Sequence, residues 1–245
     1  MTTDEFRCPE RTLLVDADDT LWENNIFYLR CTARFKSLLG EHGIAEERTQ
    51  ETLDRLERGT VQEHGYGPAG YVAAVMATAV ALLGEAGVEP TAELLAEVRR
   101  IAEPVRRAPM VLMEGVRETL LALRPTTRLV LVTKGDRPTQ LEKVARSGLG
   151  PLFDAKHVVP EKDADVYRGI ARELGLDPRC TWMVGNSVKS DINPAVEAGL
   201  GAILVPHDHT WTAEHAELEH PERVTVLRAF ADLLPLFGVP HHEPA

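Results

Sequence analysis

Four short apolar runs, each ending abruptly in polar or glycine-containing residues, constrain the fold of this chain most strongly. The runs are residues 13–15, 129–133, 182–185 and 202–205. Such runs between polar residues predict buried strands. Helical patterns occur between or after them at residues 139–147, 164–174 and 191–198. Strands that alternate with helices predict an α/β core, a doubly wound, Rossmann-like parallel sheet covered on both faces.

Residues 23–109 break this rhythm and show no convincing strand pattern. Residues 71–83 are apolar almost all round, which predicts the buried centre of a helical cluster. Thr91 is placed to cap a further helix. The sequence therefore predicts an all-helical domain at 23–109, inserted into a core made of residues 1–22 and 110–245.

Composition and charge exclude several classes of function. The formal net charge is −11, so no general basic field exists to hold nucleic acid or an anionic membrane. No apolar run approaches the length of a membrane span, and the first residues lack the apolar stretch of a secretory signal. The three scattered cysteines, Cys8, Cys31 and Cys180, argue against a disulfide framework or a zinc ribbon and favour a reducing cytoplasm.

Polar residues follow the predicted strands at the edge where ligands bind in an open parallel sheet. These residues are Asp16, Asp18, Thr20, Thr133, Lys134, Gly135, Lys162, Asn186, Ser187 and Asp191. Carboxylates brought together repel one another unless a cation joins them. The oxygen atoms of Asp16 and Asp191 suit a hard dication, for which Mg²⁺ is the best candidate.

A phosphate dianion as ligand accounts for the remaining residues. At about 4 Å, two unit charges interact by roughly 4 kcal/mol at an effective dielectric near 20. An aspartate that attacks a phosphate meets repulsion of that order for each charge pair, which Mg²⁺ and Lys162 would offset. The Thr133 side chain and the amides of Lys134 and Gly135 would bind the other phosphoryl oxygens.

The order of these motifs resembles that of the haloacid dehalogenase (HAD) superfamily. The matching elements are DADDT at 16–20, the strand that ends in Thr133, Lys162, and GNSVKSD at 185–191. The resemblance extends over about residues 11 to 240. It implies that the helical insert is the family's cap domain and that the chain is a hydrolase.

The resemblance also implies the role of each acid. Asp16 would be the nucleophile that forms an aspartyl-phosphate, and Asp18 the general acid and base. Mg²⁺ would be held by Asp16, the backbone carbonyl of Asp18, and Asp191. Two residues depart from the family's pattern: Asn186 stands where an acid is usual, and Asp163 follows the lysine of the third motif where proline is common.

We therefore expect a Mg²⁺-dependent phosphatase that hydrolyses a small phosphorylated metabolite and is a monomer or homodimer. Trp22 and Asn24, which follow the first motif, are expected to bind the substrate at the mouth of the site. A dehalogenase would leave Asp18 without a task, and a phosphomutase would have to keep water from the aspartyl-phosphate. A phospho-accepting receiver domain is a non-enzymatic alternative, but such domains are about half this length.

Other polar residues near these motifs receive structural interpretations. Asp19 is expected to cap the following helix, and Thr20 to brace the first loop by hydrogen bonding. The Lys134 side chain is expected to face the entrance of the site. Residues 207–209, His-Asp-His, are expected to form a surface loop.

Overall fold

The computed structural model describes residues 6, 8, 10–64 and 66–240, and for residues 61–64 it describes the backbone alone. The chain divides into two compact units. The first comprises Met1–Glu23 and Met110–Ala245, and the second comprises Asn24–Pro109.

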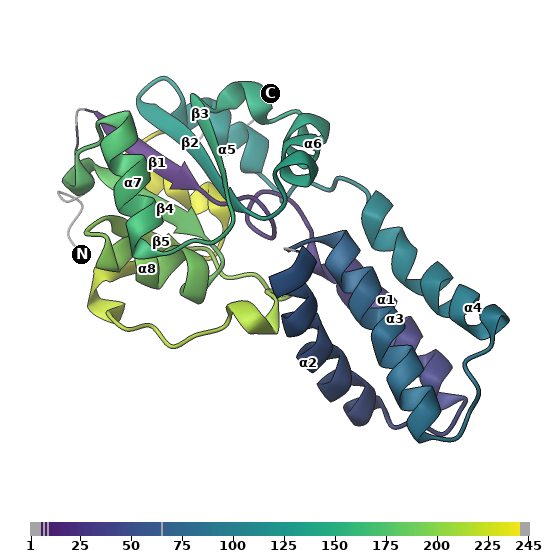
Figure 1. Ribbon diagram of the computed structural model, residues 1–245. Coiled ribbons are helices and arrows are strands. Elements are labelled where there is room, and N and C mark those ends of the chain that lie inside the picture. Colours follow the sequence, from purple (N-terminus) through teal and green to yellow (C-terminus); the bar gives the residue numbers. More distant parts are fainter. Residues whose placement is uncertain (1–5, 7, 9, 65, 241–245) are drawn as a thin grey trace. The chain divides into compact units, whose positions relative to one another are not determined.

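The first unit is built on a six-stranded sheet with the order β3-β2-β1-β4-β5-β6, in which all neighbouring strands are parallel. Its strands are β1 (Arg11–Val15), β2 (Thr127–Lys134), β3 (Ala155–Val159), β4 (Thr181–Gly185), β5 (Gly201–Leu204) and β6 (Val224–Val226). The chain runs outward from β1 to β3 and then crosses to β4 on the other side (Figure 1). The carboxyl ends of β1 and β4 therefore meet at the topological switch point, where ligands bind in such sheets.

Alternation along the central strands explains why helices cover both faces of the sheet. Leu13 and Val15 pack into one apolar cluster with Leu129, whereas Leu14 packs into a second cluster with Val130. Successive strand residues point to opposite faces, so a continuous apolar run fills two cores at once. This arrangement confirms the predicted α/β class.

The helices of this unit are α5 (Val116–Leu123), α6 (Arg137–Ser147), α7 (Ala164–Leu174), α8 (Asn193–Glu197) and α9 (Leu233–Leu236). Asp136 and Asp163 cap α6 and α7 by accepting hydrogen bonds from backbone amides, and both helices end at a glycine with positive φ. The predicted helix at 191–198 is instead a π-helical turn, Val188–Ile192, followed by α8.

The second unit consists, within its described residues, of helices and the turns between them. The helices are α1 (Asn25–Gly40), α2 (Glu46–His64), α3 (Pro68–Glu85) and α4 (Ala92–Ala102). Thr91 caps α4 as predicted, its hydroxyl accepting a hydrogen bond of 3.3 Å from the Leu94 amide. Among the described residues, α3 is the one helix long and apolar enough to cross a membrane, but half of it is buried inside the protein. It forms the centre of this unit's apolar core.

A disulfide joins Cys8 to Cys180, with the two Cα atoms 5.6 Å apart, and Cys31 is a buried free thiol. The prediction against disulfides was therefore wrong for this pair. The two cysteines lie 172 residues apart in the sequence, but they precede β1 and β4, which are neighbouring strands. The argument for a reducing compartment from unpaired cysteines no longer holds.

Close packing at Gly201 generates a stability prediction. A Cβ atom at this position would lie 2.0 Å from Cδ1 of the buried Trp182. Gly201→Ala should therefore lower the free energy of unfolding by about 1–3 kcal/mol, because the indole must move. Urea denaturation measures this change. The matched control is Gly169→Ala in α7, where a Cβ meets no atom within 4 Å. Equal effects of both substitutions would contradict the packing argument.

Candidate active site

The loop after β1 is tied to the neighbouring strand before it turns back on itself. The Asp16 amide donates a 2.9 Å hydrogen bond to the Val184 carbonyl, which continues the pairing of β1 with β4. The Leu21 amide then returns to the Ala17 carbonyl at 2.8 Å. Asp19 adopts a left-handed conformation, with φ of 61°, inside this turn. The backbone thus fixes Asp16 at the switch point of the sheet.

Lys162 brings together two acids that are far apart in the sequence. Its Nζ donates hydrogen bonds of 2.5 Å to Asp16 Oδ1 and 2.7 Å to Asp191 Oδ1. The side chains of Lys162 and Asp191 are 2% and 1% exposed. Three residues selected from the sequence therefore meet in one buried cluster of charges.

The charges of this cluster are not balanced by the protein alone. Burial opposes the charge of Lys162, but Asp16 and Asp191 outweigh it and raise the pKa of the amine well above its ordinary value. Burial raises the pKa of Asp191 to about 7, against the charge of Lys162 and with a further contribution from Asp16. One ammonium faces two carboxylates, so the cluster carries an excess of negative charge that a further cation would offset.

The second oxygen of Asp16 is held from the other side. The Thr20 hydroxyl lies 2.8 Å from Asp16 Oδ2 and 3.1 Å from Asn186 Oδ1, and its one proton serves both acceptors. This contact confirms the predicted bracing role of Thr20. Asn186, the residue that departs from the family's pattern, donates its amide hydrogen to the Thr210 hydroxyl at 2.8 Å.

Gly185 leaves the space that Asp191 occupies. A Cβ at this glycine would lie 2.2 Å from Asp191 Oδ2. The same carboxylate oxygen accepts a 3.0 Å hydrogen bond from the Ser187 amide. The spacing of the last motif therefore lets the π-helical turn fold its acid back against the end of β4.

The end of β2 differs in part from the expectation. Thr133 is buried and is the second-last residue of β2. The Gly135 amide, predicted to bind phosphate, instead donates a 3.0 Å hydrogen bond to the Val159 carbonyl and extends the pairing of β2 with β3. The Lys134 side chain, predicted to face the entrance, is largely buried, and its Nζ lies 2.6 Å from Glu214 Oε1. Both corrections arise because neighbouring elements already satisfy these groups.

Trp22 and Asn24 lie in different units of the chain. The Trp22 side chain is 1% exposed and packs in the core of the first unit, so it does not line a mouth. Its indole Nε1 donates a 2.7 Å hydrogen bond to Asp18 Oδ1, which a sequence position alone could not show. Asn24 is the first residue of the helical unit, where its carbonyl accepts a 3.2 Å hydrogen bond from the Phe27 amide.

Helix α6 supplies two site residues that sequence reasoning missed. Lys143 Nζ lies 2.8 Å from Asp18 Oδ2 and 3.0 Å from Oδ1, and Gln140 Nε2 lies 3.0 Å from Oδ2. Burial would raise the pKa of Asp18, but the charge of Lys143 and the three donors outweigh it, so this pKa is lowered. The available signal was the i, i+3 spacing of Gln140 and Lys143 on a helix that begins directly behind the β2 loop.

Glu214 is a third missed residue, and it joins three segments around the site. Its carboxylate accepts hydrogen bonds of 2.6 Å from Lys134, 2.7 Å from the Ser187 hydroxyl and 2.5 Å from the Ser190 hydroxyl. Burial would raise the pKa of Glu214, but Lys134 and the hydroxyl donors outweigh it and lower it. A single acid in a long loop carries no sequence pattern, which is why it was overlooked.

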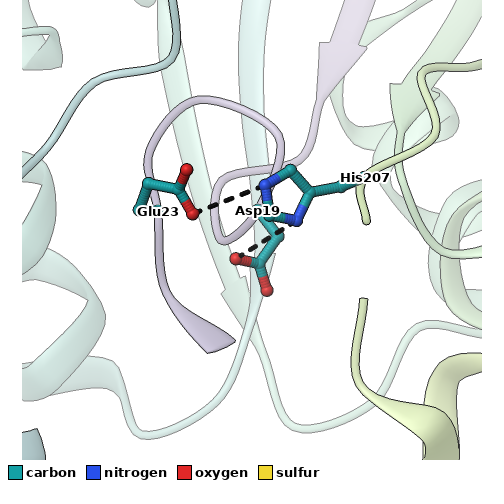
Figure 2. A group of neighbouring side chains, drawn as sticks. All are labelled: Asp19, Glu23 and His207. Atoms are coloured by element: carbon teal, nitrogen blue, oxygen red, sulfur yellow. Dashed lines mark ion pairs between the residues drawn. The ribbon is translucent and has the colours of Figure 1, made fainter. Parts of the chain in front are cut away.

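A second group of titratable side chains joins the loop after β1, which carries Asp19 and Glu23, to the segment after β5, which carries His207 (Figure 2). His207 Nδ1 is 3.8 Å from Asp19 Oδ1, and its Nε2 is 3.4 Å from Glu23 Oε2. The prediction that Asp19 caps a helix was wrong, because α1 begins only at Asn25. His207 is partly buried, with its side chain 15% exposed, while Asp208 beside it is exposed, so residues 207–209 lie in a surface loop as predicted. The three ligand atoms lie within 4.8 Å of one another, close enough to share a cation, but the two acids face different ring nitrogens.

The contacts of Glu214 generate a prediction of pH-dependent stability. Glu214→Gln should lower the free energy of unfolding by roughly 1–3 kcal/mol near pH 7, because Lys134 loses the closer and more buried of its two acidic partners, Glu214 and Glu161. The lowered pKa of Glu214 means that this stabilisation is complete above its ordinary value of 4.5 and is lost as pH falls through the folded-state value. Urea denaturation at pH 7 and at a pH below the folded-state pKa of Glu214 tests this, with substitution of the exposed Glu217 by Gln as the control. A pH-independent penalty would contradict the assignment.

Several known proteins are similar to this chain in sequence. Residues 10–199 match the family of haloacid dehalogenase-like hydrolases. The human N-acylneuraminate-9-phosphatase is 35% identical over 100 residues, which cover 39% of this chain and 40% of that protein. The glyceraldehyde 3-phosphate phosphatase of Methanothermobacter thermautotrophicus is 33% identical over 115 residues, or 43% of this chain and 49% of that protein. These matches therefore span less than half of each relative's length.

A solved structure is similar over nearly the whole chain. It is a haloacid dehalogenase-like family hydrolase from Xanthomonas campestris, with a TM-score of 0.77 and 29% identity. The alignment covers 94% of this chain and 93% of that one. Together with the match over residues 10–199, it establishes that this chain belongs to the haloacid dehalogenase-like hydrolase family.

Proposed function

We propose that this chain is a Mg²⁺-dependent phosphatase that hydrolyses a small phosphomonoester through an aspartyl-phosphate on Asp16. The observation that carries the proposal is the buried contact of Lys162 with both Asp16 and Asp191. A nucleophilic carboxylate that approaches a phosphate dianion needs positive charge at the point of attack, and this contact supplies part of it. The phosphatase relatives support the same reaction class.

Mg²⁺ fits the residues that are present. Asp16, Asp191 and the backbone carbonyl of Asp18 would hold it, and all three offer the oxygen ligands that this ion prefers. The unbalanced negative charge around Lys162 supports a dication here. When bound, Mg²⁺ supplies positive charge that offsets the repulsion between the carboxylate and the phosphate.

The side chains around Asp16 prepare it for attack on phosphorus. Lys162 and Thr20 each hold one of its carboxylate oxygens, which fixes the direction of the carboxylate. In the first step an Asp16 oxygen bonds to phosphorus while the bond to the leaving oxygen breaks. The Thr133 hydroxyl and the Lys162 ammonium are the proposed donors to the phosphoryl oxygens.

Asp18 is the proposed carrier of the proton. It gives a proton to the leaving oxygen and later takes one from the water that cleaves the aspartyl-phosphate. A halide leaving group needs no proton, so a dehalogenase would have no use for an aspartate held by three donors. Family membership over residues 10–199 disfavours the receiver domain. A phosphomutase would form the same aspartyl-phosphate but would have to keep water away from it. It is the remaining alternative.

The helical insert at 23–109 is the proposed cap domain, and residues 1–22 and 110–245 are the proposed catalytic core. A cap would exclude water and select the leaving group, and Asn24 at its start remains a proposed substrate-binding residue. The two named relatives act on phosphorylated metabolites, so we propose a small phosphorylated metabolite as substrate. A phosphate-release screen of the purified protein with Mg²⁺ against a panel of such compounds would identify it.

Removal of divalent metal should abolish activity. The acids around Lys162 need a further cation, so EDTA should stop phosphate release and excess Mg²⁺ should restore it. Mg²⁺ should also raise the melting temperature of the wild type through binding to the folded state. Asp191→Asn should lose most of this thermal shift. Full activity in EDTA would contradict the metal assignment.

Substitution of the two acids of the first motif should have different effects. Asp16→Asn should lower turnover by roughly three orders of magnitude or more, because an amide is not a nucleophile here. Asp18→Asn should slow single-turnover phosphoryl transfer more for a sugar phosphate than for p-nitrophenyl phosphate, whose leaving group needs little protonation. The exposed Asp208→Asn is the control. Equal losses on both substrates would count against Asp18 as the acid.

A further inference from the structure

We infer that Lys143 is a positioning residue that, with Gln140, orients the Asp18 carboxylate for proton transfer. This inference rests on the proposed function, because it assigns a partner to the proton carrier of that reaction. It extends the site to helix α6, which carries neither the proposed nucleophile nor a proposed metal ligand.

The geometry of the Asp18 carboxylate is the first observation. Lys143 Nζ contacts both of its oxygens, at 2.8 and 3.0 Å. Gln140 Nε2 adds a hydrogen bond of 3.0 Å to Oδ2, and Trp22 Nε1 adds one of 2.7 Å to Oδ1. Each oxygen thus accepts two hydrogen bonds, which fills the four lone-pair positions of a carboxylate. The orientation of Asp18 is therefore fixed by three different side chains.

The second observation is that these donors are themselves held in place. Gln140 is 5% exposed, and its Nε2 also donates a 2.8 Å hydrogen bond to the Lys134 carbonyl at the end of β2. Asp136 caps α6 directly after the β2 loop, which fixes the start of the helix. Trp22 is buried in the core cluster. Lys143 completes this set of donors, and its side chain is 17% exposed.

The contact of Lys143 with both oxygens allows Asp18 to exchange a proton without losing its orientation. When one oxygen gives up an accepted hydrogen bond in order to carry a proton, the ammonium keeps its bond to the other oxygen. In the first step the proton that Asp18 took from water in the preceding turnover passes to the leaving oxygen as the bond of that oxygen to phosphorus breaks. In the second step Asp18 takes a proton from the water that attacks phosphorus, and Lys143 keeps its three protons throughout.

A lysine near a phosphatase site could instead bind the phosphate directly. A double-mutant cycle separates the two roles, because a residue that acts through Asp18 has nothing left to act through once Asp18 is replaced. The four proteins are the wild type, Lys143→Met, Asp18→Asn and the double variant. Lys143→Arg tests rescue, and the exposed β3 lysine in Lys156→Met controls for loss of one charge.

The measurement is the single-turnover rate of phosphoryl transfer with an alkyl and an aryl phosphate in saturating Mg²⁺. Lys143→Met should slow the alkyl phosphate by about 10- to 100-fold, a part of the roughly 10²- to 10⁴-fold that acid–base catalysis provides. The aryl phosphate should slow by less than about 3-fold, because its leaving group needs little protonation. In the Asp18→Asn background, Lys143→Met should add less than about 2-fold. Lys143→Arg should recover most of the lost rate, and Lys156→Met should match the wild type.

The following results would overturn the inference. Equal loss on both substrates, or a full additional loss in the Asp18→Asn background, would place Lys143 on the phosphate instead. Additive melting temperatures across the cycle would show that the pair does not form, whatever the activity. A wild type that hydrolyses no phosphomonoester would overturn the proposed function, and this inference with it. An active wild type with additive losses would overturn the role of Lys143 alone.

Discussion

The buried ion pairs of Lys162 with Asp16 and Asp191 are the interaction on which the rest of this site depends. Asp16 follows β1, Asp191 follows β4 and Lys162 follows β3. The contact therefore joins segments that follow three different strands. Burying such charges is costly unless they are paired and hydrogen-bonded. These buried charges lie where the sheet order reverses, and the excess negative charge of the two carboxylates over the one ammonium suits a bound cation.

Two outer sets of contacts keep this centre in place. Glu214 ties the β2 end to the loop and π-helical turn that carry Asp191, through Lys134, Ser187 and Ser190. Helix α6 holds Asp18 through three hydrogen bonds to its carboxylate, two from Lys143 and one from Gln140, and Trp22 of the core donates a fourth. Each acid of the site is therefore oriented by groups from a different strand or helix. In the proposed reaction, the nucleophile is therefore held in place before the substrate binds.

The sequence predicted those parts of the fold and site that depend on local patterns. Apolar runs identified β1, β2, β4 and β5, and strand ends in a parallel sheet converge by geometry, which brought the main acids and the lysine together. It could not show β6, which has three residues, or the disulfide, which depends on which strands are neighbours. The burial of Trp22 and the partners of Glu214 and Lys143 arise from tertiary packing, for which a single residue in a chain gives no periodic signal.

Direct detection of the covalent intermediate tests the central claim most sharply, namely that Asp16, aligned by Lys162, accepts the phosphoryl group. Asp18→Asn protein, which should accumulate the intermediate, would be mixed with p-nitrophenyl phosphate and Mg²⁺, quenched in acid and mapped by mass spectrometry. We expect a phosphoryl adduct on the peptide that contains Asp16, absent from Asp16→Asn protein treated in the same way. A stable adduct at another residue, or phosphate release of equal rate from Asp16→Asn protein, would contradict it.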